Sequence, residues 1–265
     1  MNNDFKHLLK LLDDDNEQAA SLAMAELIQH DDPRLERILR SLQETPDPKL
    51  RRRIHQMQSA IIKRRNRRTM ADSLRKGEYS LLEGIIRLHL LWFDNDTRPE
   101  VLQQWQDFLQ ESAVLQGCRI EKLFAFLGEK IRCVGFSKDD LNADTICLGT
   151  ILEDGAAIDF MCCIIAKLLA EAWNTRMEIV QIGGEFAILC GGTLFYPGKQ
   201  WESIPNFNPG THVWSTGELL SLVASTLFTC AVATDSFRYI YTIGNCLLDG
   251  TENILFLPYP YGNEK

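Results

Sequence analysis

Two adjacent cysteines and one downstream histidine are the residues of this chain that could carry out nucleophilic chemistry. Cys162 and Cys163 lie in the apolar run IDFMCCIIAKLLAEAW, and His212 follows in the segment Pro-Gly-Thr-His. A thiol paired with an imidazole is the nucleophile of cysteine-dependent hydrolases and acyltransferases. Both cysteines, however, fall in the middle of an expected buried helix, where burial raises the pKa of a thiol and leaves it inert. A relocated catalytic pair is therefore an alternative, and we favour structural roles for both thiols and a surface position for the histidine.

The elements that would position these residues form an α+β pattern. Residues 158–173 are apolar on nearly every face, with Lys167 and Glu171 on the one polar stripe, which predicts a central helix buried almost all round. A buried helix that leads into an antiparallel sheet is typical of an α+β domain. Three short strands joined by Gly-Gly turns are expected after the helix, at residues 177–182, 185–190 and 193–196.

Three short motifs in this frame resemble those of the SirB-type bacterial transglutaminase-like family. Residues 155–161 (GAAIDFM) resemble the Gly-x-Cys turn that starts the core helix of that family. Residues 184–186 (GEF) resemble its Gly-His-Phe, and residues 195–197 (FYP) resemble its Asp-Pro at the third strand. The resemblance covers roughly residues 78–215. It implies a papain/transglutaminase-like core, in which the central buried helix packs on an antiparallel sheet.

The resemblance also marks the positions that hold the catalytic cysteine, histidine and aspartate in enzymatic members of this superfamily. Here they are Ala157, Glu185 and Tyr196, and a shift of two residues would move the first position to Asp159. Alanine has no nucleophile, and a glutamate cannot replace the imidazole that shares a proton with a thiol near neutral pH. The resemblance therefore implies a degenerate, non-catalytic member, a pseudoenzyme.

The inherited cleft is the candidate binding site. Its expected lining is Asp159, Glu185, Tyr196 and Trp201, the last at the start of a loop rich in Pro, Asn and Gly that could lie across the cleft. A glutamate at such a position could bind a cation or an amine, although an exposed strand glutamate is the simpler interpretation. We expect a binding or regulatory module for a protein or peptide partner, with no cofactor and no metal.

Residues 1–76 are expected to form a separate helical domain, and residues 77–265 the transglutaminase-like domain. Helical spacing of apolar residues recurs in four segments, three of which follow Asp-rich or Asp-Pro turns. Short helix pairs of this kind resemble HEAT-like repeats, which commonly present a surface to another protein. A simple bundle of three or four helices would give the same pattern. The four segments are residues 5–12, 17–28, 33–43 and a helix that begins at Asp47-Pro48.

Positive charge is concentrated in the last of these helices. Residues 1–76 have a net charge of +4, whereas the rest of the chain has −12. Nucleic-acid binding through the helix from Arg51 to Arg68 is a second alternative, because clustered arginines neutralise phosphates. The absence of interleaved aromatic residues and an overall pI of 5.2 favour a solvated helix face instead. This candidate basic surface consists of Arg51, Arg52, Arg53, Arg64, Arg65, Arg67 and Arg68.

Composition is that of an ordinary globular protein, with 45% hydrophobic and 24% charged residues. The eight cysteines include no Cys-x-x-Cys pair, which favours reduced core thiols over a zinc site or a disulfide framework. No apolar run of membrane-spanning length is free of charge, and acidic residues interrupt the N-terminal segment. We therefore expect a cytoplasmic protein without a membrane segment, and its oligomeric state stays open.

Further helices are predicted from their start signals. Capping boxes begin at Ser80 and Thr97, a third helix is expected at residues 119–130, and another starts at Ser215. Residues 133–144 are expected to be irregular. Residues 237–248 could be helix or strand, and the aromatic end at residues 256–261 is expected to pack as a strap.

Overall fold

The structure is a computed structural model, and it has mixed helix and sheet. It describes residues 3–29, 33–76, 79–93, 95–135, 142–205 and 211–234, with residues 236, 239–240 and 243–244. The chain divides into two compact units, residues 1–69 and 70–265. This division falls inside a helix, earlier in the chain than the boundary expected at Gly77. The segment expected as a C-terminal strap at residues 256–261 lies outside the described residues. Of residues 237–248, expected to be helix or strand, the structure describes 239–240 and 243–244, which are helical.

The described secondary structure of unit 1 is all helical, which confirms the predicted helices. Helix α2 begins where expected, because the Oδ1 of Asn16 accepts the backbone N–H of Gln18 at 3.0 Å. Its helices are α1 (Asn3–Leu11), α2 (Glu17–Gln29), α3 (Pro33–Leu42) and α4 (Pro48–Lys76), the last of which continues beyond the unit boundary. Their apolar faces meet in a small core made by Leu8, Leu12, Ala23, Leu27, Leu35, Leu39, Ile54 and Met57.

Three helices open unit 2: α5 (Leu81–Trp92), α6 (Arg98–Ser112) and α7 (Ile120–Lys130), with a short 3-10 turn η1 (Ala113–Leu115) after α6. The capping box predicted at α6 is present, since the carboxylate of Glu100 accepts the backbone N–H of Thr97 at 2.8 Å. At α5 only half of the box forms. The hydroxyl of Ser80 accepts the N–H of Glu83, but the Glu83 carboxylate pairs with Arg98 at 2.9 Å instead of returning to the cap.

The segment expected to be irregular contains a strand. β1 (Arg132–Val134) pairs in parallel with β2 (Ala156–Ile158), and between them lie the 3-10 turn η2 (Ala143–Thr145) and helix α8 (Leu148–Asp154). Gly155 joins α8 to β2 with a φ of +64°, and a Cβ there would lie 2.8 Å from the carbonyl oxygen of Lys130. Only glycine fits such a position, because it needs both a left-handed backbone and space.

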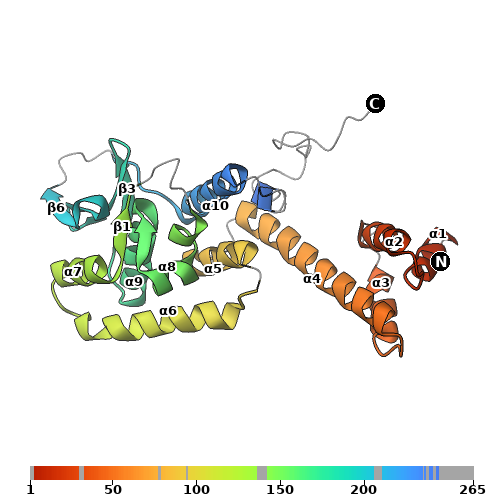
Figure 1. The fold of residues 1–265 in the computed structure, drawn as a ribbon. Helices are drawn as coiled ribbons and strands as arrows, with labels where there is room; N and C mark the ends of the chain where they lie inside the picture. The colour runs from red at the N-terminus through yellow and green to blue at the C-terminus, as the bar shows by residue number, and fades with distance from the viewer. Residues whose placement is uncertain are drawn as a thin grey trace. The chain divides into compact units, whose positions relative to one another are not determined.

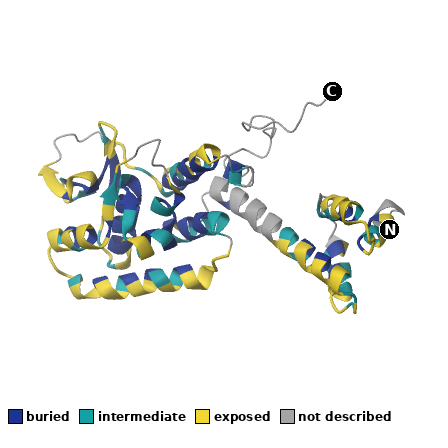
Figure 2. Ribbon diagram, in the orientation of Figure 1, coloured by how far each residue is buried: buried dark blue, intermediate teal, exposed yellow. Residues whose placement is uncertain are grey.

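Helix α9 (Asp159–Ala172) is the buried centre of unit 2, as predicted. Between Phe160 and Ala170 every residue is buried except Lys167, whose ammonium lies 3.4 Å from the carboxylate of Glu171. Figure 1 shows the other helices of the unit and the sheet around α9, and Figure 2 shows its dark blue, buried surface. A helix without an exposed face depends for its stability on the elements that cover it.

The three predicted strands are confirmed, and the sheet has a fourth. β3 (Glu178–Ile182), β4 (Glu185–Cys190) and β5 (Thr193–Tyr196) are antiparallel, and α9 packs against β4. Both hairpin turns have two glycines with positive φ, which two-residue turns of this kind require. The fourth strand is β6 (Glu202–Pro205), which pairs with β5 after the 3-10 turn η3 (Pro197–Lys199), in a region expected to be a loop.

The last long helix, α10 (Thr216–Ala233), starts at the predicted capping box of Ser215 and Glu218. Its mean hydropathy of 1.5 and its 18 residues would allow it to cross a membrane by length and composition alone. Core helices of soluble proteins pass the same test, and 44% of this segment is buried. Leu220 packs closely on Gly84 of α5, so α10 covers one side of the core.

A buried histidine near the C-terminal end of α5 joins this helix to α8 and to the turn before α6. His89 is 1% exposed, and its Nε2 lies 2.8 Å from the Oδ2 of Asp96. Its Nδ1 accepts the backbone N–H of Gly149 at the start of α8, at 3.3 Å. Because Nδ1 accepts, the ring is neutral with its proton on Nε2. Burial lowers the pKa of His89, although Asp96 and Glu153 partly oppose this shift.

Candidate functional site

The carboxylate of Asp159 connects the start of α9 to strand β4. Its Oδ1 accepts the backbone N–H of Phe160 at 2.7 Å, and its Oδ2 accepts that of Phe186 at 3.4 Å. Burial raises the pKa of Asp159, and the nearby negative charge of Glu185 raises it further, while the two backbone N–H groups oppose both effects. Asp159 and Glu185 therefore form a pair of neighbouring carboxylates, although they are far apart in the sequence.

Glu185 also belongs to a small charged cluster on the sheet. The ammonium of Lys199 lies 2.6 Å from the Oε2 of Glu185 and 4.6 Å from the centre of the Tyr196 ring. The hydrogen bond to Glu185 raises the pKa of Lys199. The side chains of Glu185 and Lys199 are 55% and 42% exposed, whereas Tyr196 is buried. Glu185 begins β4, and the antiparallel pairing of Ile188 with Phe195 brings the start of β4 beside the end of β5, where Tyr196 and η3 lie.

Ala157 occupies the middle of β2 and has no exposed surface. The prediction that a turn at residues 155–157 starts the core helix is therefore wrong. Residues 156–158 form strand β2, which pairs in parallel with β1, and the helix begins at Asp159. The Cα partner of Ala157 is Cys133, and the Sγ of Cys162 lies 3.6 Å from the Ala157 carbonyl oxygen. Three of the four cleft candidates, Asp159, Glu185 and Tyr196, lie near one another, whereas Ala157, the expected nucleophile position, lies in the core.

Trp201 is a core residue and not part of an open cleft. It is 8% exposed, stacks on Phe124 with ring centroids 4.8 Å apart, and covers Gly128. Both Gln200 and Trp201 have positive φ, at +53° and +60°, which turns the chain back so that the indole enters the core. The expected placement of Trp201 in a cleft loop is thus corrected by the packing of the β5–β6 connection.

The relocated catalytic residues considered above are not brought together. Cys162 and Cys163 are 2% and 0% exposed, and the pKa of each thiol is raised well above its ordinary value. A hydrogen bond with Cys133 is the largest cause for Cys162, and burial is the largest for Cys163. His212 is exposed, and its Nε2 lies 3.1 Å from the Oε1 of Glu218 in α10. No contact joins His212 to either thiol within the described part of the chain.

Cys133 is the residue near this site that sequence reasoning missed. It is half-buried in β1, and the pKa of its thiol is lowered, chiefly because the thiol of Cys162 donates a hydrogen bond to it. Burial and the charge of Asp159 oppose this effect. The segment from Ile131 to Val134 is mostly apolar, but so short a run does not distinguish a strand from a loop.

The candidate basic surface is only partly available to a ligand. Arg53 is 5% exposed, and its guanidinium donates to the carbonyl oxygens of Leu12 and Asp14, both at 2.8 Å. Arg51 is exposed, and its guanidinium donates to the carbonyl oxygen of Thr45 at 2.9 Å. Its neighbour Arg52 is also exposed. The side chains of Arg64, Arg65, Arg67 and Arg68 lie outside the described residues.

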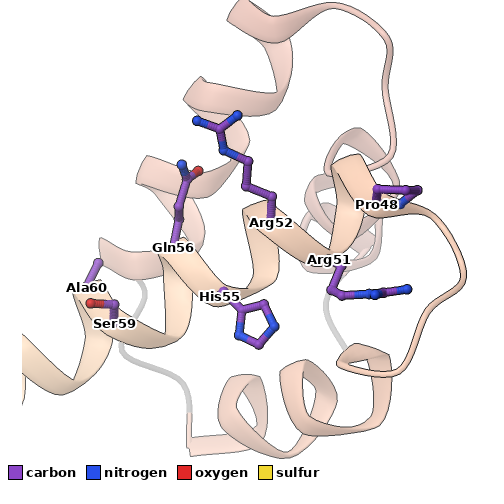
Figure 3. A pocket seen from close by; sticks show the side chains of 7 residues that line it. All are labelled: Pro48, Arg51, Arg52, His55, Gln56, Ser59 and Ala60. Atoms are coloured by element: carbon purple, nitrogen blue, oxygen red, sulfur yellow. The ribbon is translucent and has the colours of Figure 1, made fainter.

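An open hollow of 810 Å³ lies along the first turns of α4 (Figure 3). It is lined by Pro48, Arg51, Arg52, His55, Gln56, Ser59 and Ala60. All seven residues come from a single helix, so the hollow lacks the convergent walls of a small-molecule site. Among the residues that the structure describes, no three His, Cys, Asp or Glu side chains are placed to hold a metal ion.

Comparison with known proteins adds no relative for this chain. No protein-family model, curated protein or solved structure shows significant similarity to it. The function must therefore be argued from the residues themselves.

Proposed function

We propose that this protein is a non-catalytic transglutaminase-like protein whose α+β unit binds a positively charged segment of a protein or peptide partner. The observation that carries the proposal is the state of the three positions marked by the family resemblance. Ala157 is fully buried, Glu185 is paired with Lys199, and Tyr196 is buried beneath the same ammonium. None of them supplies a thiol or an imidazole. The packing of α9 on β4 is consistent with a core of this type.

Charge supports a cationic partner. Asp159 and Glu185 are close enough for one to raise the pKa of the other, and residues 77–265 carry a net charge of −12. Lys199 is the internal cation of this acidic site. A lysine or arginine of a bound peptide would replace Lys199 beside Glu185, and the surrounding negative field would favour its approach.

The binding test compares two labelled peptides that differ only in whether their charged residues are lysine or glutamate. The lysine peptide is expected to bind, more weakly as salt is raised, because the contact is exposed to solvent. Replacing the competing cation, as in Lys199→Ala, should strengthen binding several-fold. Glu185→Gln should weaken it to a similar extent, since exposed ion pairs have modest energies.

A second ion pair of unit 2 provides the matched control. Lys130 and Glu111 are 2.7 Å apart, with side-chain exposures of 42% and 55%, the same as those of Lys199 and Glu185. Glu111→Gln should leave peptide binding unchanged. An equal loss of affinity in Glu111→Gln, or a preference for the glutamate peptide, would show that general charge and not this site is responsible.

Catalytic competence is tested separately by offering a glutamine-containing peptide with a primary amine, and a peptide thioester for hydrolysis. No turnover above the blank is expected. Turnover that is lost in Cys162→Ser or Cys163→Ser and also in His212→Ala would overturn the proposal in favour of the relocated thiol enzyme. An active site would need both a core thiol and the exposed His212, whereas an unspecific reaction would not depend on both.

A further inference from the structure

Two cysteines from distant parts of the chain meet beside Ala157. Cys133 is the Cα partner of Ala157 in the β1–β2 pair, and the Sγ of Cys162, in the first turns of α9, lies 3.6 Å from the carbonyl oxygen of Ala157. Both side chains therefore lie beside the same residue of β2, one on the neighbouring strand and one on the helix that follows it. Neither is part of a disulfide. Secondary structure thus holds two reduced thiols close to one backbone position.

The two thiols have different environments. Cys133 is half-buried, whereas Cys162 is 2% exposed. The S–H of Cys162 can donate either to the Ala157 carbonyl oxygen or to the sulfur of Cys133, and the second choice stabilises a thiolate on Cys133. The pKa of Cys133 is accordingly lowered, while that of Cys162 is raised. The more accessible sulfur is therefore the better nucleophile, and the buried one keeps its proton.

We propose that Cys133 and Cys162 form a peroxide-sensitive dithiol that is oxidised to an intramolecular disulfide. An accessible thiol that ionises readily beside a second, resolving thiol is the arrangement that redox-sensing cysteines use. Transient disulfides of this kind occur also in reducing compartments, where structural disulfides are rare. This proposal does not rest on the partner-binding function proposed above, although the charge of Asp159 acts on the thiol of Cys133.

The reaction balances with hydrogen peroxide as the oxidant. The thiolate of Cys133 attacks one peroxide oxygen, the O–O bond breaks, and the leaving hydroxide takes up a proton to give water and a sulfenic acid. The sulfur of Cys162 then attacks the sulfenic sulfur, the S–O bond breaks, and a second water leaves as the S–S bond forms. The two thiols lose two electrons together, and peroxide gains them. A thiol reductant reverses the change by exchange.

The remaining described cysteines lack this combination of features. Cys147, Cys163 and Cys230 are buried, and burial raises the pKa of all three thiols. Cys190 is half-buried like Cys133, but burial raises its pKa and no thiol faces it among the described residues. Cys190 is consequently the matched control, because its thiol is as accessible as that of Cys133 but its pKa is not lowered.

The experiment treats the reduced full-length chain with hydrogen peroxide at neutral pH, blocks the remaining thiols, and measures intact mass and peptide maps. A Cys118→Ser background removes the exposed thiol that could link two chains. The expected product has lost two hydrogen atoms and yields one linked peptide pair that contains Cys133 and Cys162. Dithiothreitol should restore the starting mass.

Variants separate the two roles. Cys162→Ser should stop at a sulfenic acid on Cys133, which dimedone traps, and Cys133→Ser should form no disulfide, while Cys190→Ser behaves as the parent. A linked pair that maps to other cysteines, or oxidation of Cys190 as fast as that of Cys133, would overturn the proposal. The map of the parent protein gives this answer even where Cys162→Ser does not fold.

Discussion

Arg53 donates from Nη1 to the carbonyl oxygen of Leu12 at 2.8 Å, and this bond ties α4 to the end of α1. The same nitrogen reaches the carbonyl of Asp14 in the following turn, and Nη2 lies 3.3 Å from the carboxylate of Glu17. Arg53, which the sequence analysis placed in the candidate basic surface, is thus a buried residue that connects α4 to α1. Its neighbour Arg52 is exposed.

Replacing Arg53 should lower the local stability of α1 and α2. Arg53→Met keeps an apolar stem but leaves the carbonyls of Leu12 and Asp14 without a donor, which costs about 1–3 kcal/mol. Hydrogen exchange of peptides from α1 and α2 in the full chain is the measurement, and protection should fall. Arg52→Met should change stability by no more than about 0.5 kcal/mol. Equal loss of protection in the two variants would contradict the assigned role.

The neutral state of His89 predicts a loss of stability in mild acid. Its folded pKa is lower than the ordinary value of 6.5, so the unfolded chain binds the proton more readily. The contribution of His89 to the free energy of unfolding is complete above pH 6.5 and decreases as the pH falls through the lower folded pKa. The slope of this decrease is at most about 1.4 kcal/mol per pH unit.

Denaturant unfolding of unit 2 at a series of pH values tests this dependence. In His89→Gln, the free energy of unfolding should depend less steeply on pH below 6.5, whatever the substitution does to stability at neutral pH. A slope that survives in His89→Gln would assign the titration to another group.

Glycine in place of Gln200, in the turn before β6, should make unit 2 more stable. Gln200 has a φ of +53°, and a non-glycine residue in this conformation is strained by roughly 1–2 kcal/mol. Gln200→Gly should stabilise unit 2 by up to about 1 kcal/mol after the entropy of the unfolded glycine is subtracted. Gln181→Gly in β3 has no such relief and should destabilise by about 0.5–1 kcal/mol. Thermal unfolding of both variants measures the difference in sign.

Three glycines of unit 2 form a graded series for substitution by alanine. Gly155 has a positive φ and a backbone oxygen 2.8 Å from the added Cβ, Gly117 has a positive φ with open space, and Gly135 has neither restriction. Gly155→Ala should destabilise most, by more than the roughly 1 kcal/mol expected for Gly117→Ala, and Gly135→Ala should have little effect. A different order in denaturant unfolding would contradict the close approach of Gly155 to Lys130.

Several elements were predictable because their causes are local. The helix starts at Thr97 and Ser215 follow from cap chemistry within four residues, and the two hairpins follow from glycine pairs that allow positive φ. Helix α9 follows from an apolar run with one polar stripe. Each of these signals lies within a single segment, so one pass along the chain reveals it.

The strands β1 and β2 and the packing of Trp201 were not predictable in this way. β1 and β2 have three residues each, and they pair across the sequence between Arg132 and Ile158, so neither has a periodicity of its own. Trp201 enters the core only because two successive residues take a left-handed backbone. These features depend on contacts between distant segments, which composition and spacing do not encode.

By itself, the sequence determined the mixture of helix and sheet, the helical N-terminal unit and the buried central helix. Only the tertiary structure decided which residues share a site. It buried Ala157, placed Glu185 under Lys199, and brought Cys133 to Cys162. The reason is that local propensity acts through neighbours in the chain, whereas the chemistry of a site depends on distances and burial that arise when separate elements pack.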